Sequence, residues 1–159
     1  MENTVRNKMR FNGTPEPLNA IVQAVASEDG KDPLSFERII PLEPGDSMEE
    51  KWGVPSGPEE LDWILYRDGT VLEYTFDTLG KTPLPIFQKI AEKYPECRMT
   101  VEYADEDYGE NCGKYVSEEG RTELKPVEPD EEPFDFACLL WDKDPDEERQ
   151  ELMINAYEE

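Results

Sequence analysis

The clearest folding signal in this chain is one continuous stretch, residues 70–103. Apolar and polar residues alternate over residues 70–78, which is the pattern of a strand with one buried and one solvated face. Apolar residues then recur at helical spacing over residues 83–94, after Thr82 as the expected N-cap, and alternation resumes at residues 98–103. A strand, a helix and a strand in succession predict half of an α+β sandwich, with the helix on one face of the sheet.

The beginning of the chain has a similar order. Residues 4–12 alternate like a strand. After a turn at residues 13–15, apolar residues at i, i+3, i+4 and i+7, from Leu18 to Val25, predict a helix that closes near Gly30. The outward face of that strand carries three cations, Arg6, Lys8 and Arg10. If the strand lies between the two others, these cations should form ion pairs across a solvated face with Glu73, Asp77 and Glu102. RNA-binding sheets of this topology carry aromatic residues on that face, whereas the aromatic residues here turn inward, so nucleic-acid binding is not favoured.

Shorter patterns assign the other segments. The expected elements are an edge strand or extended segment at residues 36–41, a short helix at 58–67, a hairpin of 112–116 with 122–124, a strand at 134–141, and a final helix capped by Asp144 with Glu147 reciprocating. An insertion at about residues 42–69 is expected to rest on the core through Trp52 and Trp63. The chain then divides into one domain at residues 1–125 and, at residues 126–159, an acidic linker, a strand and a C-terminal helix packed on the same domain.

The charge of the chain restricts its partners. The 159 residues include 39 acidic and 16 basic residues, and the formal net charge is −23. A molecule with this charge repels nucleic acid and anionic membranes, and it attracts basic proteins. The chain has no apolar run of 18 residues and no basic or apolar leader at its N-terminus, so a soluble cytoplasmic protein is expected.

The residue types present disfavour catalysis. The chain has no histidine, which removes the commonest general base and the commonest transition-metal ligand. Its three cysteines, Cys97, Cys112 and Cys138, are expected to be reduced, and acidic neighbours disfavour a Cys112 thiolate. The acids of residues 142–146 resemble a calcium loop only superficially, since Glu147 stands where the loop needs glycine. No catalytic residue, cofactor or metal site is expected.

Several motifs resemble those of a known family. They are Asn7-x-Met9-x-Phe11-x-Gly13, Phe36-Glu37-Arg38-Ile39-Ile40-Pro41, the helix of residues 83–94 followed by Pro95, and Glu102-Tyr103 with the later Gly113. This set is similar to the YubB-like family of plasmid and phage proteins, with a ferredoxin-like domain of the DUF1281 type. The resemblance covers residues 1–116 and implies a ferredoxin-like antiparallel sheet with helices on one face. It also implies a mobile-element setting, but no established activity or catalytic residues.

The chain departs from the family pattern at two places. Residues 66–70 read Tyr-Arg-Asp-Gly-Thr where the family has a Trp-Gly-Thr-Lys-Trp run, and the tryptophan before the helix-opening prolines is absent. The segment from Pro126 onward is expected to be an addition to the family pattern.

The charge and the resemblance together favour a non-enzymatic binding protein of a phage, plasmid or integrated element. In this hypothesis it inhibits a basic host protein by mimicking the charge of nucleic acid; alternatively, the acidity only maintains solubility. A second class of hypothesis is a small-molecule-binding or enzymatic domain with a pocket near Trp52, Trp63 and Tyr66. A homo-oligomer through Leu152, Met153 and Tyr157 is a third. The candidate partner-binding residues are Asp105, Glu106, Asp107, Glu110, Asp130, Glu131, Glu132, Asp142, Asp144, Asp146, Glu147 and Glu148.

Overall fold

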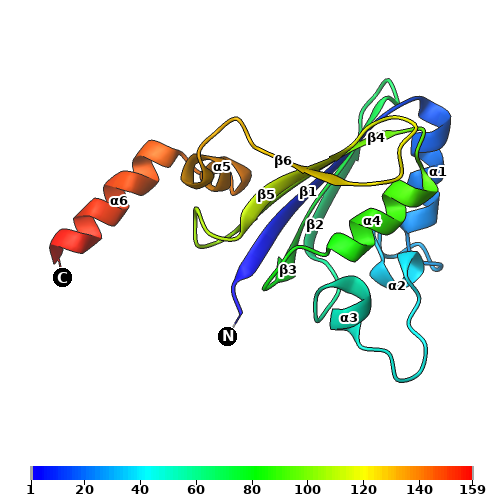
Figure 1. Cartoon of the computed structure of the whole chain (residues 1–159), viewed down its shortest axis with the longest axis horizontal. Coiled ribbons are helices and arrows are strands. Elements are labelled where there is room, and N and C mark those ends of the chain that lie inside the picture. Colours follow the sequence, from blue (N-terminus) through cyan, green and yellow to red (C-terminus); the bar gives the residue numbers. More distant parts are fainter. Residues whose placement is uncertain (1, 159) are drawn as a thin grey trace.

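The computed structural model describes residues 2–158 as one antiparallel sheet with helices on both sides (Figure 1). In chain order the elements are β1 (Thr4–Asn12), α1 (Pro15–Val25), α2 (Phe36–Ile39), α3 (Met48–Trp52), β2 (Glu59–Leu65), β3 (Val71–Leu79), α4 (Leu84–Lys93), β4 (Arg98–Asp105), β5 (Cys112–Ser117), β6 (Lys125–Val127), α5 (Pro133–Leu140) and α6 (Pro145–Glu158). The strand order across the sheet is β2-β3-β1-β4-β5-β6.

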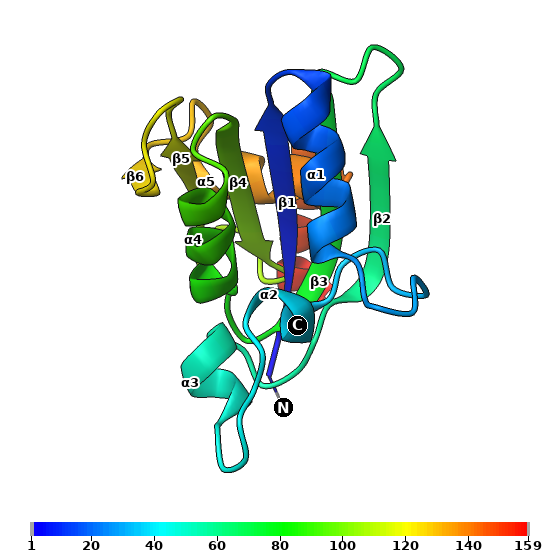
Figure 2. The ribbon, with the colours of Figure 1, turned by 90° about the vertical axis from the view of Figure 1, so that its right-hand side faces the viewer.

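The first four strands and the helices α1 and α4 have the β-α-β-β-α-β order of the ferredoxin-like fold. The helices α1 and α4 lie on one face of the sheet, and α2 and α3 lie on the same face. The helix α5 lies on the opposite face, behind the sheet in Figure 2. The predicted α+β, ferredoxin-like class is therefore confirmed. The strands β5 and β6 extend the sheet beyond β4.

The centre of the fold is β1, which pairs with β3 on one side and β4 on the other. Its residues alternate between buried and half-buried, and Met9 and Phe11 belong to the main core with residues of β3, β4, α1 and α4. The predicted strands at both ends of residues 70–103, and the helix between them, are confirmed. Gly13 follows β1 where space is short, because an added Cβ would lie 3.1 Å from the Cys97 sulfur.

A polar residue lies within this core. Asn7 is fully buried, and its amide donates to the Thr78 hydroxyl at 2.9 Å and to the Val5 and Phe76 carbonyls at 3.3 Å. Its side-chain oxygen accepts from the Thr82 hydroxyl at 2.7 Å. Thr82 was expected to be the N-cap of α4, but its hydroxyl is used here instead, and Pro83 occupies the cap position. The network therefore ties the start of α4 to the central strand.

Three predicted elements have the wrong type. Residues 36–41 begin with the helix α2 because Ser35 caps it, its hydroxyl accepting from the Arg38 N–H at 3.2 Å. The predicted helix at residues 58–67 is the edge strand β2. The pairing register of β2 with β3 shifts between Glu59 and Asp62, where Glu60 has a φ of 52°. Because of this bulge, the apolar residues of β2 do not alternate with polar ones along the sequence, and their spacing resembles that of a helix. The predicted insertion at 42–69 thus contains an edge strand of the main sheet.

The third error is the predicted strand at residues 134–141, which forms the helix α5. Phe136, Ala137, Cys138 and Leu140 are all buried, so the apolar run has no polar stripe, and a short run of this kind does not distinguish strand from helix. The C-terminal addition is therefore two helices rather than a strand and a helix. Residues 122–124 are also not a strand; the partner of β5 is β6, which begins at Lys125.

Candidate functional site

The candidate site lies on the outer face of the sheet, opposite α1 and α4. Arg6 binds Asp77 through two hydrogen bonds, of 3.0 and 3.3 Å, and the Arg10 guanidinium lies 3.4 Å from the Glu73 carboxylate. The hydrogen bond to Asp77 raises the pKa of Arg6 above its ordinary value. Cross-strand ion pairing is therefore confirmed at these two positions. Lys8 lies opposite Glu102 in the register but forms no ion pair in the described part of the chain.

One end of this face is covered rather than solvated. The Arg6 guanidinium lies 4.2 Å from the centre of the Trp141 ring, and the Trp141 indole N–H donates to the Ala104 carbonyl at 2.9 Å. Beside this contact, Ala137 and Leu140 of α5 form a small core with Ala104. A stacked cation, a hydrogen bond and a buried apolar contact together fix α5 against β1 and β4.

The beginning of α6 is capped as the sequence predicts. One carboxylate oxygen of Asp144 accepts from the backbone N–H groups of Asp146, at 2.9 Å, and Glu147, at 3.4 Å. Glu147 takes part through its backbone N–H, and within residues 2–158 its side chain does not return the predicted reciprocal hydrogen bond to Asp144. Arg149 pairs with Asp135 of α5 and with Asp146, and its guanidinium lies 5.0 Å from the centre of the Phe134 ring. These contacts join the first turns of α6 to α5, and the rest of α6 extends away from the sheet (Figure 1).

The acidic turn between β4 and β5 contains one residue that serves the fold. Asp105 is only 6% exposed, and its carboxylate accepts from the Asn3 amide at 2.9 Å, the Asp107 backbone N–H at 2.8 Å and the Asn111 amide at 3.4 Å. Asp105 therefore stabilises the turn and is not a surface charge. The exposed acids of this turn are Glu106, Asp107 and Glu110.

The structure brings the turn and the C-terminal segment together. The Tyr108 ring meets the Phe134 ring edge-on, with 6.0 Å between their centres. Nearby charges, including those of Glu148 and Glu106, add to burial in raising the pKa of Tyr108. We call the exposed and half-exposed acids of this turn and of residues 142–151 the acidic end; they are Glu106, Asp107, Glu110, Asp142, Asp144, Asp146, Glu147, Glu148 and Glu151. The turn between β4 and β5 and the beginning of α6 are thus neighbours in space.

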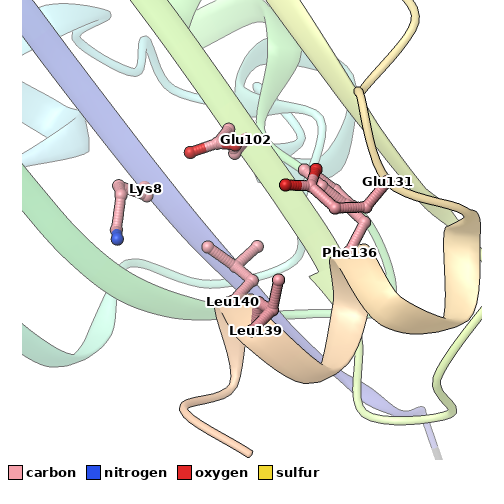
Figure 3. Close-up of a pocket in the computed structure, with 6 residues that line it drawn as sticks. All are labelled: Lys8, Glu102, Glu131, Phe136, Leu139 and Leu140. Carbon is pink, nitrogen blue, oxygen red and sulfur yellow. The ribbon is translucent and has the colours of Figure 1, made fainter. Parts of the chain in front are cut away.

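The remaining candidates, Asp130, Glu131 and Glu132, are exposed and precede α5. Glu131 lines a pocket between α5 and the sheet with Lys8, Glu102, Phe136, Leu139 and Leu140 (Figure 3). Its volume is about 110 Å³. Small-molecule sites usually have roughly 300–1,000 Å³, so this pocket has room for a few waters rather than for a substrate.

The aromatic residues of the alternative hypothesis lie apart. Trp52 is buried on the helical side, where its indole N–H donates to the Ile40 carbonyl at 2.9 Å. Trp63 stacks on Tyr74 at the β2 edge and is 39% exposed. Tyr66 lies at the end of β2, with Arg10 5.9 Å from its ring centre. These three described side chains therefore do not line one pocket.

The three cysteines are all free, and the pKa of each thiol is raised above its ordinary value. Burial, together with the charges of Glu96 and Glu119, raises the pKa of Cys97 to about 11. Burial followed by the charge of Glu110 raises the pKa of Cys112, and burial also raises that of Cys138. Within residues 2–158, no group of three acidic or cysteine side chains is placed to hold a metal ion. In the same part, no helix has the length and apolar character needed to cross a membrane.

These thiol pKa values predict slow alkylation. At pH 8, a thiol with a pKa of about 11 is roughly one part in a thousand thiolate, so native Cys97 should react with iodoacetamide about 100-fold more slowly than in urea. The rate should rise about tenfold per pH unit toward pH 10, because thiolate accumulates as the pH approaches the pKa. Mass spectrometry of the labelled peptides measures each cysteine separately. Equal rates for Cys97 in the native and unfolded chains would contradict the buried placement.

Comparison with known proteins agrees with this fold. A family model described as a ferredoxin-like domain in Api92-like protein matches residues 62–152. The chain belongs to this family. The family is of the DUF1281 type, which the sequence motifs already resembled, although the match begins within β2 and the motifs of residues 7–13 and 36–41 precede it. No curated protein and no solved structure gives a significant match.

The family match also corrects one expectation. The segment from Pro126 onward was expected to be an addition, but the matched residues continue through α5 and into α6. The residues of the acidic end therefore lie within the matched range. Sequence reasoning missed Trp141, which fixes α5 to the sheet, because the preceding run was assigned to a strand. Pro133 at the first position of α5 is the signal that could have identified the helix.

Proposed function

We propose that this Api92-like chain is a non-enzymatic binding protein that presents carboxylates to a basic, nucleic-acid-handling protein. The observation that carries the proposal is the acidic end itself. Its acids come from two parts of the sequence, and they are gathered around a pair of helices anchored to the sheet by Trp141. Acidic residues that only maintain solubility need not be held together at one place on the fold.

The charge of this region is one-sided. Residues 128–159 contain thirteen acidic and two basic residues. One of the two bases, Arg149, is already paired with Asp135 and Asp146. A field of this sign attracts a basic partner over long distances and accelerates association at low salt.

The helix also spaces its charges regularly. Glu147 and Glu151 are exposed and one turn apart, which places them about 6 Å apart along the axis of α6. Two phosphate steps on one strand of DNA span roughly 7 Å. Carboxylates at this spacing can occupy alternate phosphate sites, two steps apart, on a protein that binds nucleic acid. Inhibition of such a host protein in the cytoplasm, by a phage, plasmid or integrated element, is the setting we propose.

A pull-down from host lysate tests the proposal. The wild-type chain should retain a basic nucleic-acid-handling protein at low salt and release it at high salt, and double-stranded DNA should compete for that protein. The variant E110Q/E147Q/E151Q, which removes three exposed carboxylates of the acidic end, should bind at least about tenfold more weakly, because charge-assisted contacts contribute roughly 1.5–3 kcal/mol each. Its matched control, E28Q/E43Q/E50Q, removes three exposed acids far from the acidic end in sequence and should bind like wild type.

Two results would overturn the proposal. One is a partner that the two triple variants retain equally, since the acidic end would then have no special part in binding. The other is a small molecule that co-purifies with the chain while no protein partner is retained, which would support a ligand-binding domain instead.

A further inference from the structure

The second half of α6 exposes apolar residues that the domain does not cover. Leu152 is 58% exposed, Met153 61%, Ile154 55% and Tyr157 87%. The contacts that join α6 to α5 come from Arg149, in the early part of the helix. α6 has 14 residues, and its second half extends beyond the contacts that join its beginning to α5.

The apolar residues share one broad side of α6. At about 100° per residue, Leu152, Ala156, Met153, Tyr157 and Ile154 follow one another around an arc of roughly 200°. Arg149, which contacts Phe134 of α5, falls within the same arc. The side that faces α5 in the first turns therefore continues as an apolar surface beyond the end of the domain.

Acids border this surface on both sides. Viewed along the helix axis, the direction of Glu147 is adjacent to that of Ile154 at one border of the arc, and the direction of Glu148 is adjacent to that of Leu152 at the other. Glu151 lies on the side of the helix opposite the arc. An arc of this width is too broad for a flat contact and fits a groove that encloses the helix. The charges on its borders would then meet the two rims of that groove.

We propose that α6 is a docking helix whose apolar residues Leu152, Met153 and Tyr157 insert into an apolar groove with Lys- and Arg-rich rims on the partner protein. This inference rests on the proposed function and adds an apolar anchor to a contact that is otherwise electrostatic. The charge selects a basic partner over a second copy of the chain. Two molecules with a net charge of −23 each repel one another, and α6 carries five acids against one base.

A synthetic amphipathic peptide of leucine and lysine serves as the probe, because its apolar stripe with cationic borders reproduces the chemistry of such a groove. The full-length chain should bind the fluorescent peptide, as measured by anisotropy. The variant L152S/M153S/Y157S should bind at least about tenfold more weakly, and the loss should persist at 0.5 M salt. The matched control, M48S/I64S, removes two other exposed apolar side chains and should bind like wild type. Circular dichroism and urea unfolding confirm that each variant is folded.

Three results would overturn the inference. The first is that the wild-type chain does not bind the peptide, and the second is that the serine variant binds it as tightly as wild type. The third is that the wild-type chain sediments as a dimer which the serine substitutions dissociate. The third would make a second copy the occupant of α6. The lysate experiment separates this inference from the proposed function. If the glutamine variant loses the lysate partner and the serine variant keeps it, the proposed function is supported and the apolar anchor is not. If the chain binds the peptide but retains no basic partner from the lysate, the apolar anchor is supported and the proposed function is not.

Discussion

Substitution of Asn7 by alanine is expected to lower the free energy of unfolding by about 3 kcal/mol. Asn7 is fully buried in the central strand, where its side-chain oxygen accepts one hydrogen bond and its two amide N–H groups are shared among three acceptors. Each such bond contributes roughly 0.5–1.5 kcal/mol, and a buried partner left unpaired costs roughly 1–3 kcal/mol. The Thr82 hydroxyl loses its acceptor in this variant, and the small alanine leaves a gap in the core. Urea unfolding measures the change.

Two variants test whether the network is the cause. Lys8 follows Asn7 but points to the outer face, so K8A should change the unfolding free energy by less than about 0.5 kcal/mol. T82V removes the hydroxyl that binds Asn7, and its cost should add to that of N7A only in part, because both substitutions remove the same bond. An N7A chain within about 0.5 kcal/mol of wild type would show that the polar network does not stabilise the core.

The parts of the fold that sequence patterns predicted correctly are those where one face is buried and the other wet. In β1, Met9 and Phe11 turn inward while Arg6 and Arg10 turn outward, and the alternation in the sequence follows directly. The pattern failed at β2, where a bulge interrupts the alternation. It also failed at α5, where the exposed position among residues 136–140 is the apolar Leu139, so no polar stripe reveals the helical period.

The candidate site was predictable in composition but not in arrangement. The sequence alone identifies the acids, whereas the burial of Asp105 depends on Asn3, a residue 102 positions away. The joining of the turn to α5 depends likewise on Tyr108 and Phe134, whose rings meet only after the sheet has formed. Long-range contacts of this kind leave no local period in the sequence, so propensity and spacing do not detect them.

Substitution of Trp141 by alanine is expected to detach the acidic end from the sheet while β1 to β4 remain folded. The tryptophan stacks on Arg6, donates to the Ala104 carbonyl and packs beside Leu140. A fully buried tryptophan changed to alanine costs roughly 3–5 kcal/mol, and the half-exposed Trp141 should cost about 2–3 kcal/mol. This loss falls on the docking of α5, because Arg6 keeps its bonds to Asp77. Hydrogen exchange of the backbone amides of residues 133–140 should therefore accelerate about 30- to 100-fold.

The matched control is W63A. Trp63 stacks on Tyr74 at the far edge of the sheet, so its removal should leave the exchange of residues 133–140 unchanged. If α5 is what orients the acidic end, W141A should also weaken binding to a basic partner although every carboxylate is still present. A W141A chain with unchanged exchange in α5 and unchanged partner binding would show that the acidic end acts through charge alone, without a fixed orientation on the sheet.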